Sequence, residues 1–119
     1  MKKVYNKLVR DKMIDIYRDD VKAGIVATDF SVRYLPPHET LVALKDKLLE
    51  EAHEVFEAYS KPDSTELKEE IADVIEVIDA ILYHNNITLE EVLKLRDEKK
   101  ARKGGFEAGL FLESIDYIE

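Results

Sequence analysis

Apolar residues recur at helical spacing along most of the chain, and the few prolines and glycines fall where this spacing breaks. The pattern predicts helices over about residues 12–22 and 39–60. A third helix is expected to begin in a capping box at residues 63–66 and to end near residue 85. A fourth is expected to begin in a second capping box at residues 88–91 and to fray in a basic run. The apolar stripes of the two central helices are Leu41, Leu44, Leu48, Ala52, Val55 and Tyr59, and Leu67, Ile71, Val74, Ile78, Ile81 and Leu82.

Two segments lack helical spacing. Residues 25–35 are rich in β-branched and aromatic side chains, which favours an extended segment or a short hairpin. The tail that follows Gly104 and Gly105 is expected to be extended or briefly helical. We therefore predict a mainly α fold, a helical bundle built on a central antiparallel helix pair, with short extended segments near residues 25–35 and at the C-terminus. The bundle is expected to form a single domain over residues 1–119.

The composition excludes several classes of protein. The chain has no cysteine, so disulfides, thiol catalysis and cysteine-ligated zinc are absent. Its net charge of −8 argues against a partner that is a nucleic-acid polymer. No apolar run is long enough to span a membrane, and no export signal is recognisable, so we expect a cytoplasmic protein that does not bind membranes.

The charge is unevenly distributed along the chain. Residues 1–12 and 94–103 are basic, whereas residues 46–79 carry twelve acidic side chains against three lysines. Such blocks are most often the solvated faces of helices. A more specific interpretation depends on which acidic side chains the helical projection directs towards the core.

Four acidic residues project towards or beside the apolar faces of the two central helices. Glu51 and Glu54 lie on the border of the apolar stripe, Glu70 lies inside the apolar face of the next helix, and Asp73 lies on its edge. Both pairs have i, i+3 spacing, so antiparallel packing brings them towards each other. Buried carboxylates are costly unless they are paired or bind a cation. A chance E-x-x-E in a glutamate-rich chain, or an acidic face of a non-catalytic adaptor, is the alternative.

An all-oxygen ligand set favours a hard cation, Mg²⁺ or Mn²⁺. Such an ion completes its shell with phosphate oxygens, and the basic ends of the chain suit a polyphosphate. Neither a GxxxxGK[ST] nor a GxGxxG loop is present. Phosphate binding is therefore expected to use the metal and side chains.

Glu51-x-x-Glu54, fifteen further residues and Glu70-x-x-Asp73 form a pattern that resembles a known metal signature. It is similar to that of the all-α nucleoside triphosphate (NTP) pyrophosphohydrolases, the MazG and phosphoribosyl-ATP pyrophosphohydrolase group. Residues 5–12 (YNKLVRDK) and 103–106 (KGGF) resemble one branch, the small MazG-like proteins. The resemblance covers nearly the whole chain.

The resemblance implies Mg²⁺-dependent hydrolysis between the α- and β-phosphates of an NTP, which releases a monophosphate and pyrophosphate and serves nucleotide-pool house-cleaning. It implies that the four acids are metal ligands and catalytic residues, one of which also helps to deprotonate water. The candidate phosphate contacts are Lys7, Arg10, Lys12, Lys99, Arg102 and Lys103. Lys47 is either a phosphate contact or a salt-bridge partner, and Phe106 either stacks on a base or belongs to the core.

Three further expectations concern the oligomeric state, the substrate and His53. The short bundle and the resemblance favour a homodimer or homotetramer. Phosphoribosyl-ATP, the substrate of a relative in histidine biosynthesis, is the alternative substrate. His53 projects with Glu50 and Glu57 and is expected to face solvent.

Overall fold

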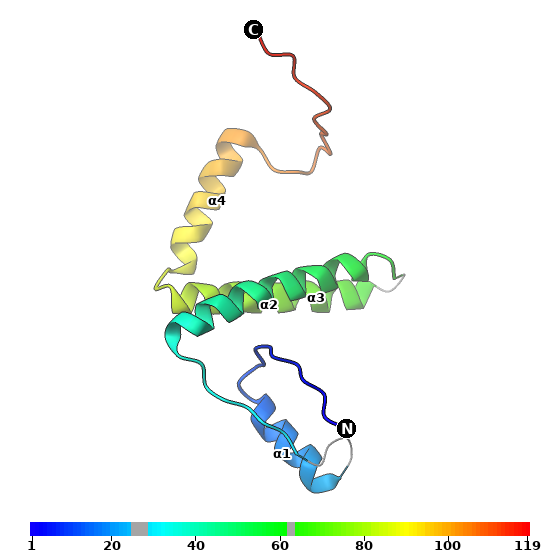
Figure 1. Ribbon diagram of the computed structural model, residues 1–119. Helices are drawn as coiled ribbons and strands as arrows, with labels where there is room; N and C mark the ends of the chain where they lie inside the picture. Colours follow the sequence, from blue (N-terminus) through cyan, green and yellow to red (C-terminus); the bar gives the residue numbers. More distant parts are fainter. Residues whose placement is uncertain (25–28, 62–63) are drawn as a thin grey trace. The chain divides into compact units, whose positions relative to one another are not determined.

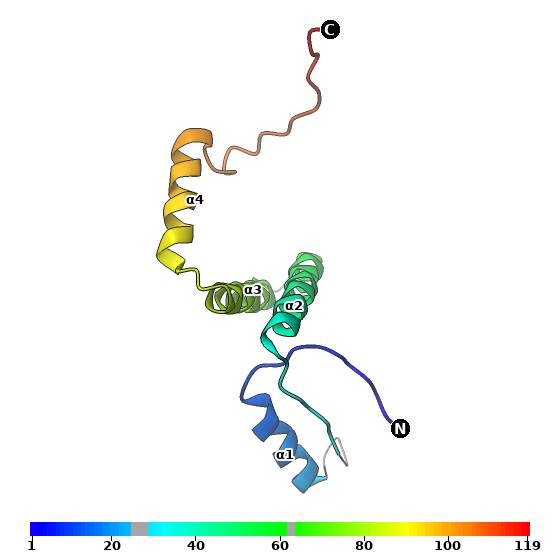
Figure 2. The ribbon, with the colours of Figure 1, turned by 60° about the vertical axis from the view of Figure 1, so that its left-hand side comes forward.

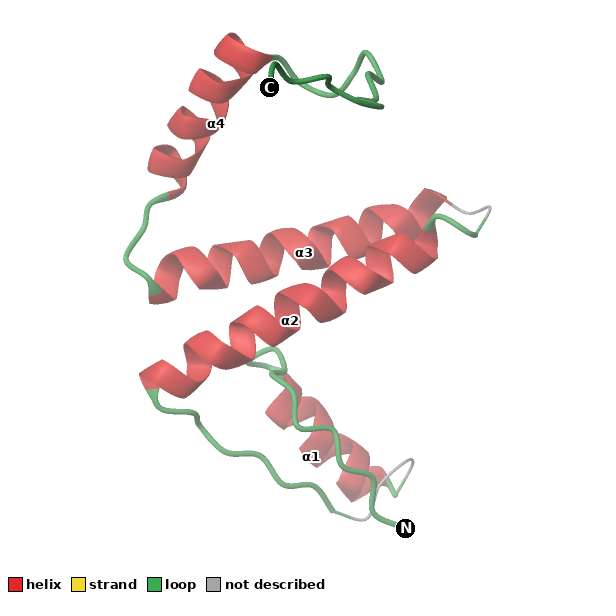
Figure 3. Cartoon of the chain, turned by 45° about the horizontal axis from the view of Figure 1, so that its top comes forward, coloured by secondary structure: helices red, strands yellow, loops and turns green. Residues whose placement is uncertain are grey.

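The chain folds into four α-helices in the computed structural model, which describes residues 1–24, 29–61 and 64–119 (Figure 1). Helix α1 spans Met13–Ala23, α2 spans Pro37–Ala58, α3 spans Ser64–His84 and α4 spans Leu89–Lys103. Within the described residues no strand is present (Figure 3). The predicted mainly α fold is therefore confirmed.

The predicted extended segments contain neither helix nor strand where they are described. Residues 29–36 and the tail after Gly104 are irregular. Residues 25–28 of the first segment, and Asp63 of the first predicted capping box, lie outside the described residues.

The ends of the helices fall at the residues that local chemistry favours. Gly24 ends α1 with a left-handed φ of 62°, which glycine adopts without steric cost. Pro37 occupies the first turn of α2, where its missing N–H needs no partner. The Thr88 hydroxyl accepts a hydrogen bond of 3.2 Å from the Glu91 N–H, as predicted for the second capping box.

Helix α2 ends two residues before the predicted boundary. The Tyr59 N–H bonds to the Phe56 carbonyl, and the Ser60 N–H bonds to the Glu57 carbonyl, which are i to i−3 contacts. Such bonds tighten the last turn and end the α-helical pattern. Tyr59 lies just beyond this end and is 74% exposed, so it does not belong to the buried part of the predicted apolar stripe.

The chain divides into two compact units, Met1–Asn86 and Ile87–Glu119. In the first unit α2 and α3 are antiparallel and pack side by side, as the views in Figures 1, 2 and 3 agree. This pair is the predicted central hairpin. The expectation of one domain over residues 1–119 stays a prediction.

The described chain buries few side chains. Among the described residues four apolar side chains are buried, Leu44, Ala58, Val77 and Leu82. Other apolar side chains of the central pair remain in contact with solvent, including Phe56 at 73% and Ile75 at 55% exposure. The apolar faces of α2 and α3 are thus larger than the contact between them. None of the described helices has the length and hydropathy needed to cross a membrane.

Candidate metal centre

Three of the four predicted acidic ligands converge between the central helices. Glu51 comes from α2, and Glu70 and Asp73 come from successive turns of α3. One carboxylate oxygen from each lies within 4.8 Å of the others, and all three residues are half-buried. The antiparallel packing of α2 and α3 therefore produces the convergence that the spacing predicts.

Glu54 does not belong to this three-residue group. It lies one turn after Glu51 on α2 and is exposed. Its negative charge nevertheless reaches the group, because it contributes to the pKa shift of Glu70. We call Glu51, Glu70 and Asp73 the acidic cluster, and Glu54 its outer neighbour.

The surroundings of Glu70 disfavour the ionised form of its carboxyl group. Partial removal from water raises the pKa of Glu70 above its ordinary value, and the charge of Asp73 raises it further. Glu54 and Glu51 add smaller contributions of the same sign. A bound cation reverses this penalty, because it favours the ionised carboxylate. The cluster thus has the oxygen donors and the concentrated negative charge that suit a hard divalent ion.

Two basic side chains contact members of the acidic cluster. The Arg10 guanidinium donates a hydrogen bond of 2.6 Å to Oδ1 of Asp73. Lys47 Nζ lies 3.3 Å from a carboxylate oxygen of Glu51 and equally far from one of Glu50. Of the two alternatives for Lys47, the salt bridge is therefore present in this structure. Its predicted phosphate contact is untested.

Glu50 has partners that its sequence position did not predict. It projects away from the apolar stripe, yet it accepts contacts from Lys47 and from Lys7, whose Nζ lies 3.5 Å away. The i, i+3 spacing of Lys47 and Glu50 is the only local signal for this interaction. His53, by contrast, is 63% exposed and pairs with Glu57 at 2.8 Å, as expected for a solvent-facing position.

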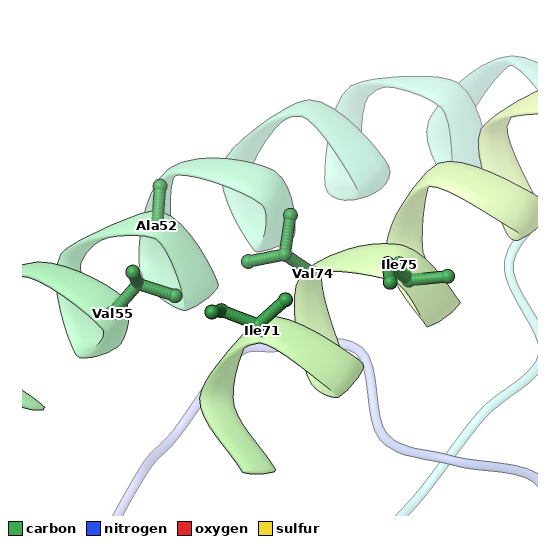
Figure 4. Close-up of a pocket in the computed structure, with 5 residues that line it drawn as sticks. All are labelled: Ala52, Val55, Ile71, Val74 and Ile75. Atoms are coloured by element: carbon green, nitrogen blue, oxygen red, sulfur yellow. The ribbon is translucent and has the colours of Figure 1, made fainter. Parts of the chain in front are cut away.

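An apolar groove is formed by α2 and α3, the same two helices that carry the acidic cluster. It has a volume of about 240 Å³, and Figure 4 shows its lining residues on facing turns of α2 and α3. Three of them directly follow a cluster acid in sequence: Ala52, Ile71 and Val74. The lining residues are Ala52, Val55, Ile71, Val74 and Ile75. The apolar periodicity placed most of them in the predicted core, although they line an open groove.

No ion pair or hydrogen bond among the described residues joins the other predicted phosphate-binding residues to the acidic cluster. Lys12 is exposed and immediately precedes α1. Lys99, Arg102 and Lys103 lie on α4, and Phe106 follows it, so all four belong to the second unit. Lys103 and Phe106 line a hollow of about 480 Å³ within residues 103–111. Phe106 is 98% exposed, so it is not a core residue of its unit.

Comparison with known proteins gives one match. The family model described as phosphoribosyl-ATP pyrophosphohydrolase matches residues 33–100, more than half of the chain. The matched range contains the acidic cluster, Glu54 and Lys47, whereas Lys7, Arg10 and Lys12 precede it. No curated protein and no solved structure matches the chain.

Proposed function

The chain belongs to the phosphoribosyl-ATP pyrophosphohydrolase family, and from this premise we propose that it is a Mg²⁺-dependent NTP pyrophosphohydrolase. Membership implies a hydrolase that acts on pyrophosphate bonds. The proposed reaction is hydrolysis of the bond between the α- and β-phosphates, with a nucleoside monophosphate and pyrophosphate as products. The observation that carries the proposal is the convergence of Glu51, Glu70 and Asp73 from two helices.

Glu51, Glu70 and Asp73 would hold the metal ion, with Glu54 as a further ligand or a charge neighbour. When bound, Mg²⁺ lowers the pKa of a ligated water and neutralises charge that develops on the leaving pyrophosphate. Mn²⁺ is expected to substitute, because it also accepts oxygen ligands. One of the carboxylates accepts the proton from the attacking water.

Basic side chains would position the polyphosphate. Arg10 lies 2.6 Å from Asp73 of the acidic cluster. Lys7 lies 3.5 Å from Glu50, which precedes Glu51 in sequence. An arginine can bind phosphate oxygens in a bidentate manner, whereas a lysine acts as a point charge. Lys12, Lys47, Lys99, Arg102 and Lys103 are further candidates, and the exposed ring of Phe106 is a candidate for stacking on the base.

The unusually exposed apolar faces favour self-association. All four side chains that are buried among the described residues lie in the first unit, and large apolar residues of α2 and α3 remain exposed. Burying such surface against a second copy stabilises both copies. We therefore expect a homodimer or homotetramer, and light scattering that reports a monomer at micromolar concentration would contradict this expectation.

A substrate panel tests the proposed reaction. The protein is incubated with Mg²⁺ and each NTP, and the products are resolved by ion-exchange chromatography. A monophosphate and pyrophosphate are expected, whereas a diphosphate and orthophosphate would overturn the proposal. Glu70→Gln is expected to abolish turnover, and Glu76→Gln, an exposed acid elsewhere on α3, serves as the matched control.

Phosphoribosyl-ATP is the second candidate substrate, because the matching family model carries that description. Both candidates share the bond that is cleaved and the proposed metal ligands. Phosphoribosyl-ATP carries an additional phosphoribosyl group, so adding this compound to the panel of NTPs separates the two candidates. A kcat/KM for phosphoribosyl-ATP well above that for every NTP would assign the chain to histidine biosynthesis instead of nucleotide-pool house-cleaning.

A further inference from the structure

The N-terminal segment, residues 1–12, reaches the central helix pair before α1 begins. Figures 1 and 3 show it rising from the N-terminus towards α2 and then turning back into α1. Two ion pairs attach it there, Arg10 to Asp73 and Lys7 to Glu50. The segment lies outside the range of the family match, so its contacts add information that the family assignment does not supply.

Arg10 occupies a carboxylate of the acidic cluster. Its guanidinium donates to Oδ1 of Asp73 at 2.6 Å, although the two residues are 63 positions apart in sequence. Asp73 is also one of the three residues whose oxygens converge in the cluster. A cation held by the cluster therefore shares Asp73 with a guanidinium, and two positive charges on one carboxylate repel each other.

Arg10 differs from the other cation that contacts the cluster. Lys47 projects from the middle of α2, and its side chain is only 18% exposed, so it is fixed by the helix. Arg10 lies in an irregular segment, and its side chain is 60% exposed. It can leave Asp73 by rotation of its own side chain, with no change in a helix.

We propose that Arg10 is an exchangeable counter-cation of the acidic cluster. In the metal-free protein Arg10 neutralises Asp73. Arg10 leaves Asp73 when the cluster holds a divalent cation, and its guanidinium then binds the phosphates of the substrate, which carry compensating negative charge. This inference rests on the proposed function, and it assigns to Arg10 a competition with metal that a simple phosphate contact does not have.

Metal affinity measured without nucleotide tests the competition. Isothermal titration with Mg²⁺ at low ionic strength compares the full-length wild type with Arg10→Gln and with Arg18→Gln. Arg18 is the matched control, because it carries the same charge in the same unit and pairs with Asp15 on α1, away from the cluster. Removing the competing charge is expected to tighten Mg²⁺ binding on the order of tenfold in Arg10→Gln, with a smaller effect at high salt.

Three results would overturn the exchange. Equal or weaker Mg²⁺ binding in Arg10→Gln means that Arg10 does not compete, and equal tightening in Arg18→Gln means that the effect is one of net charge. Arg10→Lys retains the charge and is expected to bind Mg²⁺ within a few-fold of wild type, so tightening as large as that of Arg10→Gln also contradicts it. Absence of Mg²⁺ binding in the wild type would instead overturn the proposed metal centre itself.

The second half of the exchange predicts the opposite effect on substrate. With saturating Mg²⁺, Arg10→Gln is expected to raise KM for the nucleotide by about tenfold or more, because a charge-assisted hydrogen bond to phosphate is lost. A variant with tighter metal binding and weaker nucleotide binding is not explained by a general loss of structure. An unchanged KM would contradict the transfer of Arg10 to substrate.

Discussion

Replacing Glu70 with glutamine is expected to change thermal stability in opposite directions with and without Mg²⁺. In chelator, the substitution removes a carboxylate whose ionisation is disfavoured by partial burial and by Asp73, so the melting temperature should rise. With Mg²⁺, the same substitution removes a proposed ligand. The stabilisation that the wild type gains from Mg²⁺ should therefore be lost.

The size of the Mg²⁺ effect follows from mass action. A ligand that binds only the folded state contributes about 2.7 kcal/mol when its concentration is 100 times Kd. The unit that contains the acidic cluster spans Met1–Asn86, and about 1 kcal/mol shifts the melting temperature of a domain of this size by about 4–8 °C. At a Mg²⁺ concentration 100 times Kd, the wild type should therefore gain roughly 10–20 °C, and Glu70→Gln almost nothing.

Thermal melts followed by far-ultraviolet circular dichroism, in chelator and in Mg²⁺, measure both effects. Glu76→Gln is the control for loss of one acidic side chain on α3, and it should melt like the wild type under both conditions. The reasoning is refuted if Glu70→Gln gains as much as the wild type from Mg²⁺. A large loss of stability in chelator would also refute it. A Mg²⁺-independent wild type would favour the non-catalytic adaptor.

Three further outcomes are expected. In chelator, the pKa of Glu70 is raised in the folded state, so the protonated form stabilises the fold at low pH. That contribution is lost as pH rises from the ordinary pKa of 4.5 through the raised pKa of the folded state. In urea unfolding, the wild type should therefore lose stability relative to Glu70→Gln as pH rises above 4.5. A stability difference that stays constant with pH would contradict this. Leu44→Ala empties one of the four buried positions and should lower the free energy of unfolding by about 2–5 kcal/mol, measured by urea titration. Thr88→Ala removes the cap on the Glu91 N–H at a cost of about 1 kcal/mol, so hydrogen exchange at Glu91 should accelerate.

The positions of the helices could be predicted from the sequence because the residue types at a helix end, such as glycine or threonine, favour that end locally. Gly24 and Gly104 follow α1 and α4, and Thr88 caps the start of α4. The expectation that the fourth helix frays in the basic run was wrong, because α4 continues through that run to Lys103. The end of α2 was harder to predict from the sequence, since the i to i−3 bonds of Tyr59 and Ser60 depend on backbone geometry in the turn rather than on residue type.

The acidic cluster was predictable in part. The i, i+3 spacing and the helical projection place Glu70 and Asp73 on the face of α3 that meets α2, and the antiparallel hairpin adds Glu51. Glu54 shares the same spacing but stays exposed. The periodicity defines the face of α2 on which Glu54 lies, but it does not define how much of that face α3 covers.

The pattern of apolar and charged residues did not predict the contacts between segments that are far apart in sequence. The Arg10–Asp73 pair joins an irregular segment to a helix 63 residues away, and charge alone suggested only that Arg10 binds an anion. The apolar periodicity likewise identified Ile71 and Val74 as core residues without indicating what covers them, and both line an open groove. Burial depends on packing partners, which a single helix does not encode.

Phosphorus NMR of ATP hydrolysis by wild type and by Glu70→Gln, each with Mg²⁺, tests the central claim most directly. The wild type is expected to convert the three ATP resonances into those of AMP and pyrophosphate, and the variant is expected to leave ATP intact while keeping its helical circular dichroism. Formation of ADP and orthophosphate, or turnover by Glu70→Gln at the wild-type rate, would contradict the assignment of the Glu51, Glu70 and Asp73 cluster as the metal centre of an α–β pyrophosphohydrolase.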